Sequence, residues 1–253
     1  MGYVLITGAS AGIGEEFAKQ LAKQGENLIL AARRVDRLDA LAAKLQADHN
    51  IQVKTGAADL VAPNAAEELV RKIDQAGWPI KGLINNAGFG ERGPFAKIDL
   101  ARQLNMIQLN VTVLVDLTHR LIPALEKQPD AFVINVASTA SFQAGPNMAI
   151  YYATKAFVLS FTEALHEELK KKGIKVSALC PGATQSEFAQ ESNMTDSVLF
   201  KAGVMTSEAV VHKALANRNK AIVIPGFKNW LGMFLGKLSP RSITRKLAAL
   251  MQA

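Results

Sequence analysis

The sequence VLITGASAGIG at residues 4–14 decides the fold. Its apolar start, residues 4–6, is typical of a short buried strand, and the turn behind it contains three glycines, Gly8, Gly12 and Gly14. Residues 15–22 continue with the apolar spacing of a helix. A strand that passes through a glycine-rich turn into a helix predicts the first unit of an α/β domain.

The alternation of strand and helix continues along the chain. Strand patterns lie at residues 28–30, 51–55, 80–85, 132–136, 176–179 and 222–224, and helical patterns at 38–45, after 63, at 99–125 and at 151–171. Gly25 and Gly173 fall where helices are expected to end, and Pro63 falls at an expected first-turn position. Right-handed crossovers then predict an α/β fold, a Rossmann-type doubly wound parallel sheet of about seven strands. The expected strand order is 3-2-1-4-5-6-7, with helices on both faces.

Length and composition fit one domain spanning residues 1–253. The 253 residues are 49% apolar, and no linker or repeat divides them. The single cysteine, Cys180, excludes an internal disulfide and suits a reducing compartment. Residues 1–8 enter a strand directly and leave no room for a signal peptide, so we expect a cytoplasmic location.

Charge is distributed unevenly. The net charge is +7, yet the eight basic residues after Glu208 have no acidic residue among them, so the first 208 residues are nearly neutral. This balance, without a recognition motif, argues against nucleic acid as a partner. The four histidines show no metal-ligand spacing, so no metal site is predicted.

Residues 228–253 form a basic, amphipathic C-terminal extension. Its apolar residues recur at helical spacing: Trp230, Leu231, Phe234, Leu235 and Leu238. The extension either packs on a partner subunit or over a substrate cleft, makes weak contact with an anionic membrane surface, or attracts an acidic substrate carrier. Packing is favoured, because a charge run is usually a solvated face. Its apolar run is too short to span a membrane.

The glycine turn suits a dinucleotide pyrophosphate. Backbone can approach an anion closely at Gly8, Gly12 and Gly14, and the following helix offers unpaired N–H groups and a partial positive charge. The spacing G-x-x-x-G-x-G differs from the common dinucleotide fingerprint, and a tight turn without a ligand is the alternative.

The end of the second strand indicates which dinucleotide binds. NAD-binding sheets usually place an acidic residue there to accept from the ribose 2′-OH, whereas this strand ends in Arg33 and Arg34. Guanidinium groups match a 2′-phosphate, so the cofactor is predicted to be NADP(H). Solvated helix-cap arginines are the alternative, and we expect it to hold for one of the two.

Tyr151 and Lys155 are four residues apart at the start of a predicted helix and therefore share a face. A neighbouring ammonium would stabilise the phenolate and bring the Tyr151 pKa toward working pH. Ser138 follows the strand at residues 132–136, at the edge where doubly wound sheets bind ligands. Its hydroxyl would hold the substrate oxygen that Tyr151 protonates.

With these motifs the chain resembles the short-chain dehydrogenases/reductases over nearly its whole length. The matching residues keep the family's order and approximate spacing: TGASAGIG at 7–14, Asp59-Leu60, NNAG at 85–88, Asn110, Ser138, Tyr151 with Lys155, and Pro181-Gly182. The resemblance implies that Ser138 orients a carbonyl and that Tyr151 is the general acid/base. Lys155 would hold the nicotinamide ribose and lower the Tyr151 pKa, and Asn110 would hold a water against Lys155 for proton relay.

The resemblance also implies the remaining cofactor contacts. Asp59 and Leu60 would border the adenine, and a hydroxyl after Pro181-Gly182 would reach the carboxamide, best matched by Ser186 with Thr184 as the alternative. The full expected cofactor set is Gly8, Ser10, Gly12, Ile13, Gly14, Arg33, Arg34, Asp59, Leu60, Asn86, Ala87, Gly88, Tyr151, Lys155, Pro181, Gly182, Thr184 and Ser186. A homodimer or homotetramer is implied by resemblance alone.

Residues 183–205 are expected to form a lid over the substrate. Its apolar members are Phe188, Met194, Val198, Leu199, Phe200 and Met205, and the opposite wall would be lined by Phe89, Phe142, Met148 and Ile150. Phe142 and Met148 fit an ordinary core equally well. The predicted function is NADPH-dependent reduction of a moderately apolar ketone, aldehyde or 3-oxoacyl substrate. The alternative is an NADP(H)-binding sensor or scaffold without turnover, which the proton-relay residues disfavour.

Overall fold

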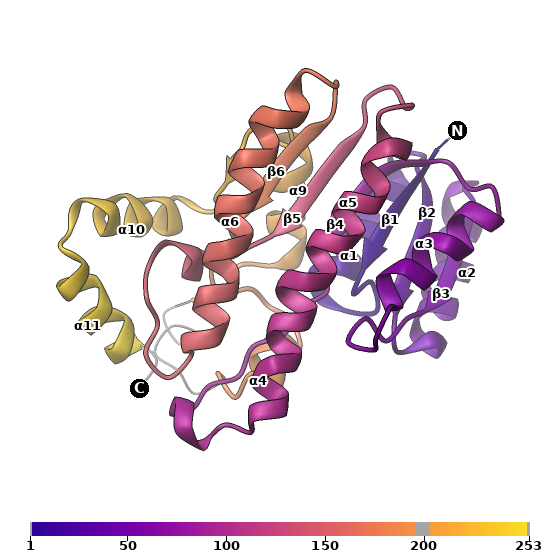
Figure 1. Cartoon of the computed structure of the whole chain (residues 1–253). Coiled ribbons are helices and arrows are strands. Elements are labelled where there is room, and N and C mark those ends of the chain that lie inside the picture. The colour runs from indigo at the N-terminus through magenta and orange to yellow at the C-terminus, as the bar shows by residue number, and fades with distance from the viewer. Residues whose placement is uncertain (1, 196–202, 252–253) are drawn as a thin grey trace.

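The computed structural model describes residues 2–195 and 203–251 and contains a seven-stranded sheet (Figure 1). Its strands are β1 (Tyr3–Thr7), β2 (Asn27–Ala32), β3 (Val53–Ala57), β4 (Ile80–Asn85), β5 (Phe132–Val136), β6 (Lys175–Leu179) and β7 (Ile222–Val223). The order is β3-β2-β1-β4-β5-β6-β7, and every neighbouring pair is parallel. The predicted fold class and strand order are confirmed.

Helices cover both faces of the sheet. They are α1 (Gly12–Lys23), α2 (Val35–His49), α3 (Ala65–Gln75), α4 (Leu100–Ile107), α5 (Val113–Leu125), α6 (Ala149–Lys170), α7 (Phe188–Glu191), α9 (Ser207–Ala216), α10 (Phe227–Leu238) and α11 (Arg241–Met251). One core joins α1, α2 and α9 to the sheet through residues such as Phe17, Leu38 and Val211. The other core joins α3 and α5 to the opposite face through Leu69 and Leu117. Figure 1 shows α5 and α6 in front of the sheet.

The predicted helix at 99–125 is confirmed as one uninterrupted helical run, residues 100–125, whose hydrogen-bond pattern changes midway. It divides into α4, a π-helical turn η2 (Gln108–Thr112) and α5, because one extra residue is accommodated where Asn110 points inward. Several boundaries also differ; for example, β3 begins at Val53 and α3 begins at Ala65. Pro63 therefore lies outside the first turn of α3, separated from it by Asn64 at φ 58°.

The C-terminal extension forms α10 and α11, drawn in yellow in Figure 1 beside α6, at one side of the sheet. No residue of α10 is buried, and α11 buries only Thr244 and Ala248. Among the described residues, no helix has the length and apolar character needed to cross a bilayer.

Candidate active site

The carboxyl ends of β1, β4 and β5 meet at one edge of the sheet and open into a cavity of about 700 Å³. Of the predicted catalytic and cofactor residues, all but Gly14 and Asn110 line this cavity. Those two are buried behind its wall. The fold therefore brings the sequence motifs together in one place, as expected for a doubly wound sheet.

The glycine turn is required by the fold as well as by a ligand. Gly8 and Gly12 have φ angles of 64° and 57°, which disfavour side chains. A Cβ on Gly14 would lie 2.2 Å from the Gly8 carbonyl oxygen, so helix α1 can approach the turn only with glycine there. At Ala11 no side chain caps the start of α1, which leaves its first N–H groups for an anion. The turn thus fits a pyrophosphate.

Asn86 has a structural role that the sequence did not reveal. Its Nδ2 donates to the carbonyl oxygens of Thr7 (3.0 Å) and Gly8 (3.1 Å). In return the Thr7 Oγ1 accepts from the backbone N–H groups of Asn86 and Ala87, each at 3.0 Å. The NNAG motif therefore fastens the end of β4 to the glycine turn and holds the cavity floor in place.

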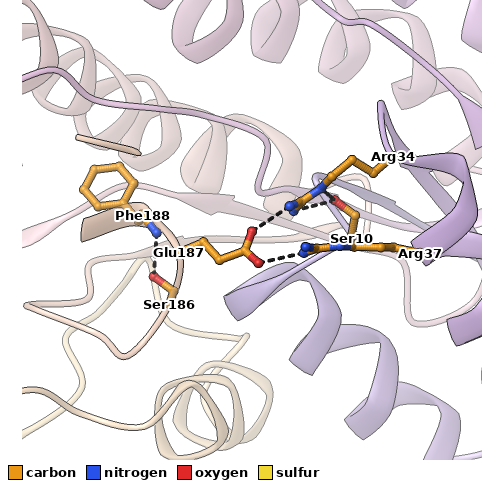
Figure 2. A network of polar contacts seen from close by, with 6 residues as sticks. All are labelled: Ser10, Arg34, Arg37, Ser186, Glu187 and Phe188. Carbon is orange, nitrogen blue, oxygen red and sulfur yellow. Dashed lines mark hydrogen bonds and ion pairs between the residues drawn. The ribbon is translucent and has the colours of Figure 1, made fainter. Parts of the chain in front are cut away.

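The arginines after β2 form a cluster with an acidic residue from the opposite side of the cavity (Figure 2). Arg34 Nη1 and Arg37 Nη1 donate to the two carboxylate oxygens of Glu187, at 2.7 and 2.6 Å. Arg34 Nε and Nη2 also donate to the Ser10 Oγ, at 3.2 and 3.1 Å. Arg33 is exposed and lines the cavity. Sequence reasoning missed Arg37 and Glu187, because their positions, 150 residues apart, gave no local pattern.

Ser138, Tyr151 and Lys155 lie together at the end of β5. Lys155 Nζ donates to the carbonyl oxygen of Val136 (2.7 Å) and lies 5.9 Å from the centre of the Tyr151 ring. Ser138 Oγ accepts from the N–H of Ala140 (3.1 Å), which begins the turn η3 (Thr139–Phe142).

The Tyr151 pKa shifts in the direction opposite to the one we expected, upward rather than toward working pH. Burial raises the Tyr151 pKa well above its usual value of 10.0, and the hydrogen bond with Ser138 offsets only part of that rise. Burial likewise lowers the pKa of Lys155 to about 8. We expected the Lys155 ammonium to set the direction of the Tyr151 pKa shift. Desolvation sets it instead, because both side chains are buried. Tyr151 therefore keeps its proton at neutral pH.

Asn110 is buried inside the π-helical turn. Its Oδ1 accepts from the N–H of Phe89 (3.1 Å), and its Nδ2 donates to the Phe89 carbonyl (3.0 Å) and to Thr154 Oγ1 (3.1 Å). A Cβ on Gly88 would lie 2.8 Å from Asn110 Oδ1 and 3.6 Å from Lys155 Nζ. Asn110 thus fixes the loop after the NNAG motif beside Lys155.

Apolar residues enclose the part of the cavity around Tyr151. Phe188 and Met194 come from the predicted lid and pack with Met148 and Tyr151. Phe89 and Phe142 also line the cavity, whereas Ile150 packs behind it. Met205 packs instead against the core under α1, so it is not part of the lid surface. Val198, Leu199 and Phe200 lie outside the described residues.

Both ends of the extension reach the same cavity. Its lining residues from α10 and α11 and the turn between them are Lys228, Asn229, Gly232, Met233, Leu235, Gly236, Ser239, Thr244, Leu247 and Met251. Lys237 Nζ lies 5.5 Å from the centre of the Phe142 ring. Within the described part of the chain, no group of three or more His, Cys, Asp or Glu side chains gathers as a metal site would require.

The fold, the glycine turn and the Ser138–Tyr151–Lys155 group define a nicotinamide-dependent oxidoreductase. The sequence profile of the short chain dehydrogenases matches residues 2–197, and the chain belongs to this family, whose members act on alcohol and carbonyl groups.

Three individual proteins show the range of the similarity. The chain is 36% identical to sulfoacetaldehyde reductase 2 of Chromohalobacter salexigens over 187 residues, 73% of each protein. It is 35% identical to serine 3-dehydrogenase of Agrobacterium fabrum over 189 residues, 74% of each. The solved structure of a short-chain dehydrogenase from Sphingobium yanoikuyae in complex with NADPH superposes with a TM-score of 0.83, at 32% identity over 94% of both chains.

Proposed function

We propose that this chain is an NADPH-dependent reductase of a moderately apolar ketone, aldehyde or 3-oxoacyl compound. The observation that carries the proposal is the position of the buried Tyr151 in the same cavity as the glycine turn, together with Ser138 and Lys155. A proton donor, a hydroxyl to orient a carbonyl and an anion site in one cavity are the parts that carbonyl reduction needs.

The reaction follows from these side chains. When bound, the nicotinamide supplies the hydride to the carbonyl carbon. Ser138 donates a hydrogen bond that orients the carbonyl oxygen, and Tyr151 gives that oxygen a proton as negative charge develops there. Lys155, held at the Val136 carbonyl, places an ammonium where the phenolate left on Tyr151 is stabilised.

Preference for NADPH rests on the basic groups beyond β2. Arg33 and Arg34 line the cavity, and Arg37 lies next to Arg34 on Glu187. The two guanidinium groups that meet at Glu187, with Arg33 on the cavity wall next to Arg34 in sequence, favour a phosphate over a hydroxyl, because each offers a planar fork of donors to an anion. The NADPH complex of the Sphingobium relative supports the same assignment.

An apolar substrate is supported by the cavity wall, which differs in character from the substrates that two of the relatives are named for. The named substrates of the two curated relatives, sulfoacetaldehyde and serine, are small and polar. The wall of this cavity contains Phe142, Phe188 and Met194, and further lining comes from α10 and α11, which lie beyond the family match at residues 2–197. We therefore propose that α10 and α11 contribute to substrate choice.

The test is a fluorescence titration with NADPH and NADH, followed by NADPH oxidation with ketones, aldehydes and 3-oxoacyl thioesters. We expect tighter binding of NADPH and turnover of at least one apolar carbonyl compound. Tight NADPH binding without turnover of any compound would favour the sensor or scaffold function instead.

The extension is proposed to pack on a second copy of the chain, giving a dimer or tetramer. Its exposed apolar side chains, with Phe227, Trp230 and Phe234 in one stack, lack cover within the described monomer. Light scattering should give a mass of two or four chains, and Leu238→Asp should lower it. Binding to anionic vesicles at low salt by a monomer would favour the membrane alternative. A cytoplasmic location stays a prediction.

A further inference from the structure

Glu187 occupies the guanidinium groups that a cofactor phosphate would need (Figure 2). Each carboxylate oxygen accepts from a different arginine, at 2.7 Å from Arg34 and 2.6 Å from Arg37. All three nitrogens of the Arg34 guanidinium are engaged, because Nε and Nη2 donate to Ser10. The pKa of Glu187 is held below its usual value by these hydrogen bonds.

The site that Glu187 fills lies beside the cofactor cavity. Ser10, Arg34 and Glu187 line that cavity, and Ser10 belongs to the glycine turn that fits the pyrophosphate. An anion on the adenosine side of the turn would therefore reach the same Arg34 donors. A carboxylate and a phosphate cannot both occupy one guanidinium fork.

We propose that Glu187 is a specificity-determining residue that competes with the 2′-phosphate of the cofactor for Arg34 and Arg37. This inference rests on the proposed binding of NADPH. The phosphate can bind only when the carboxylate leaves the arginines. Breaking the Glu187 ion pairs therefore reduces the net affinity for the phosphate. A cofactor that lacks the phosphate leaves the Glu187 pairs intact.

The free energy of the Glu187 ion pairs is small enough for a phosphate to displace the carboxylate reversibly. The side chains of Arg34 and Glu187 are 38% and 40% exposed, so solvent screens the ion pairs and each is weak. A phosphate carries more negative charge than a carboxylate at neutral pH and offers three acceptor oxygens, which favours its displacement of Glu187. If Glu187 is paired with Arg34 and Arg37 in most molecules without cofactor, a variant that cannot form these pairs should bind the phosphate about three- to tenfold more tightly.

The segment carrying Glu187 links the phosphate end of the cavity to the proton donor. On one side of Glu187, the Cβ of Ser186 lies 2.9 Å from where a Cβ on Gly12 would be. On the other side, the Phe188 ring packs on Tyr151 at 5.4 Å between centroids. The segment keeps a second attachment, because Arg92 N–H donates to the Ser192 carbonyl at 3.1 Å. Loss of the Glu187 pairs therefore frees only the start of α7.

The test uses cofactor fragments and needs no turnover. Isothermal titration calorimetry compares adenosine 2′,5′-bisphosphate with adenosine 5′-monophosphate on the wild-type chain and on Glu187→Gln. We expect the variant to bind the bisphosphate about three- to tenfold more tightly and the monophosphate unchanged. Glu191→Gln is the matched control, since it removes one negative charge from α7, the helix that follows Glu187, without touching Arg34 or Arg37. The ratio of the bisphosphate affinity to the monophosphate affinity should be the same in Glu191→Gln as in the wild type.

Two distinct failures separate this inference from the proposed function. If the wild type binds both fragments equally, the NADPH preference fails and the inference with it. If the wild type prefers the bisphosphate and Glu187→Gln leaves that ratio unchanged or lowers it, only the competition is overturned. Hydrogen exchange gives a second readout: the bisphosphate should speed exchange at residues 187–191 of the wild type but not of Glu187→Gln. Equal changes in both proteins would also contradict the competition.

Discussion

The ring of Phe188 lies on the ring of Tyr151, with 5.4 Å between centroids and 45° between planes. Tyr151 belongs to the first turn of α6, whereas Phe188 opens α7 on the segment after β6. A residue from the predicted lid therefore covers the proposed proton donor. This cover is part of the burial that raises the Tyr151 pKa.

Phe188→Ala should weaken substrate binding more than cofactor binding. Removing the ring takes apolar surface from the substrate wall and admits water above Tyr151. We expect KM for an apolar carbonyl compound to rise about tenfold, with the NADPH Kd nearly unchanged. Steady-state kinetics and a fluorescence titration measure the two quantities. The matched control is Phe157→Ala, an exposed ring on α6 that does not line the cavity, which should leave both constants unaltered.

Tyr151→Phe should abolish turnover while NADPH still binds. The variant keeps the ring that Phe188 covers and removes only the proton that reaches the substrate oxygen. Loss of a general acid costs about 10²–10⁴-fold in rate, so kcat should fall by at least a hundredfold. Tyr152→Phe is the control, because it removes a hydroxyl from the adjacent tyrosine on α6, whose ring packs against Gly145. Near wild-type turnover in Tyr151→Phe would overturn the proposed mechanism.

Lys155 should make stability depend on pH. Its pKa is about 8 in the folded protein against 10.5 for the free side chain, so between these values the unfolded chain binds more protons. Raising the pH through this window therefore disfavours unfolding. Between pH 8 and 9 the free energy of unfolding should rise by about 1 kcal/mol more in the wild type than in Lys155→Met. Urea unfolding at both pH values measures the difference. An equal change in the free energy of unfolding between pH 8 and 9 in the two proteins would show that Lys155 is not desolvated.

Arg33→Ala and Arg34→Ala should each weaken NADPH binding and spare NADH. Each removes charge-assisted donors to a 2′-phosphate, which NADH lacks, so the NADPH Kd should rise about tenfold or more. Fluorescence titrations with both cofactors give the ratio. Arg120→Ala, which removes a cation paired with Asp116 and Glu67 on a distant helix, is the charge control. Parallel losses for NADPH and NADH would mean that these arginines do not read the phosphate.

Sequence patterns were sufficient to predict those features of the fold that depend on residues close together along the chain. Apolar runs bounded by glycine turns predicted the strands, and right-handed crossovers then left one sheet order, which the structure confirms. The spacing of Tyr151 and Lys155 put both on one face of α6. The π-helical turn at Asn110 escaped prediction, because apolar periodicity runs through 99–125 without a break and the inserted residue shows only in the backbone.

The sequence by itself determined the order of the sheet, the glycine turn and the types of side chain available for hydride and proton transfer, because these depend on neighbours along the chain. Only the tertiary structure decided that burial outweighs Lys155 in setting the Tyr151 pKa, and that Glu187 pairs with Arg34 and Arg37. Solvent exclusion and charge pairing depend on distances through space. Two segments 150 residues apart meet at those distances only after the sheet has assembled.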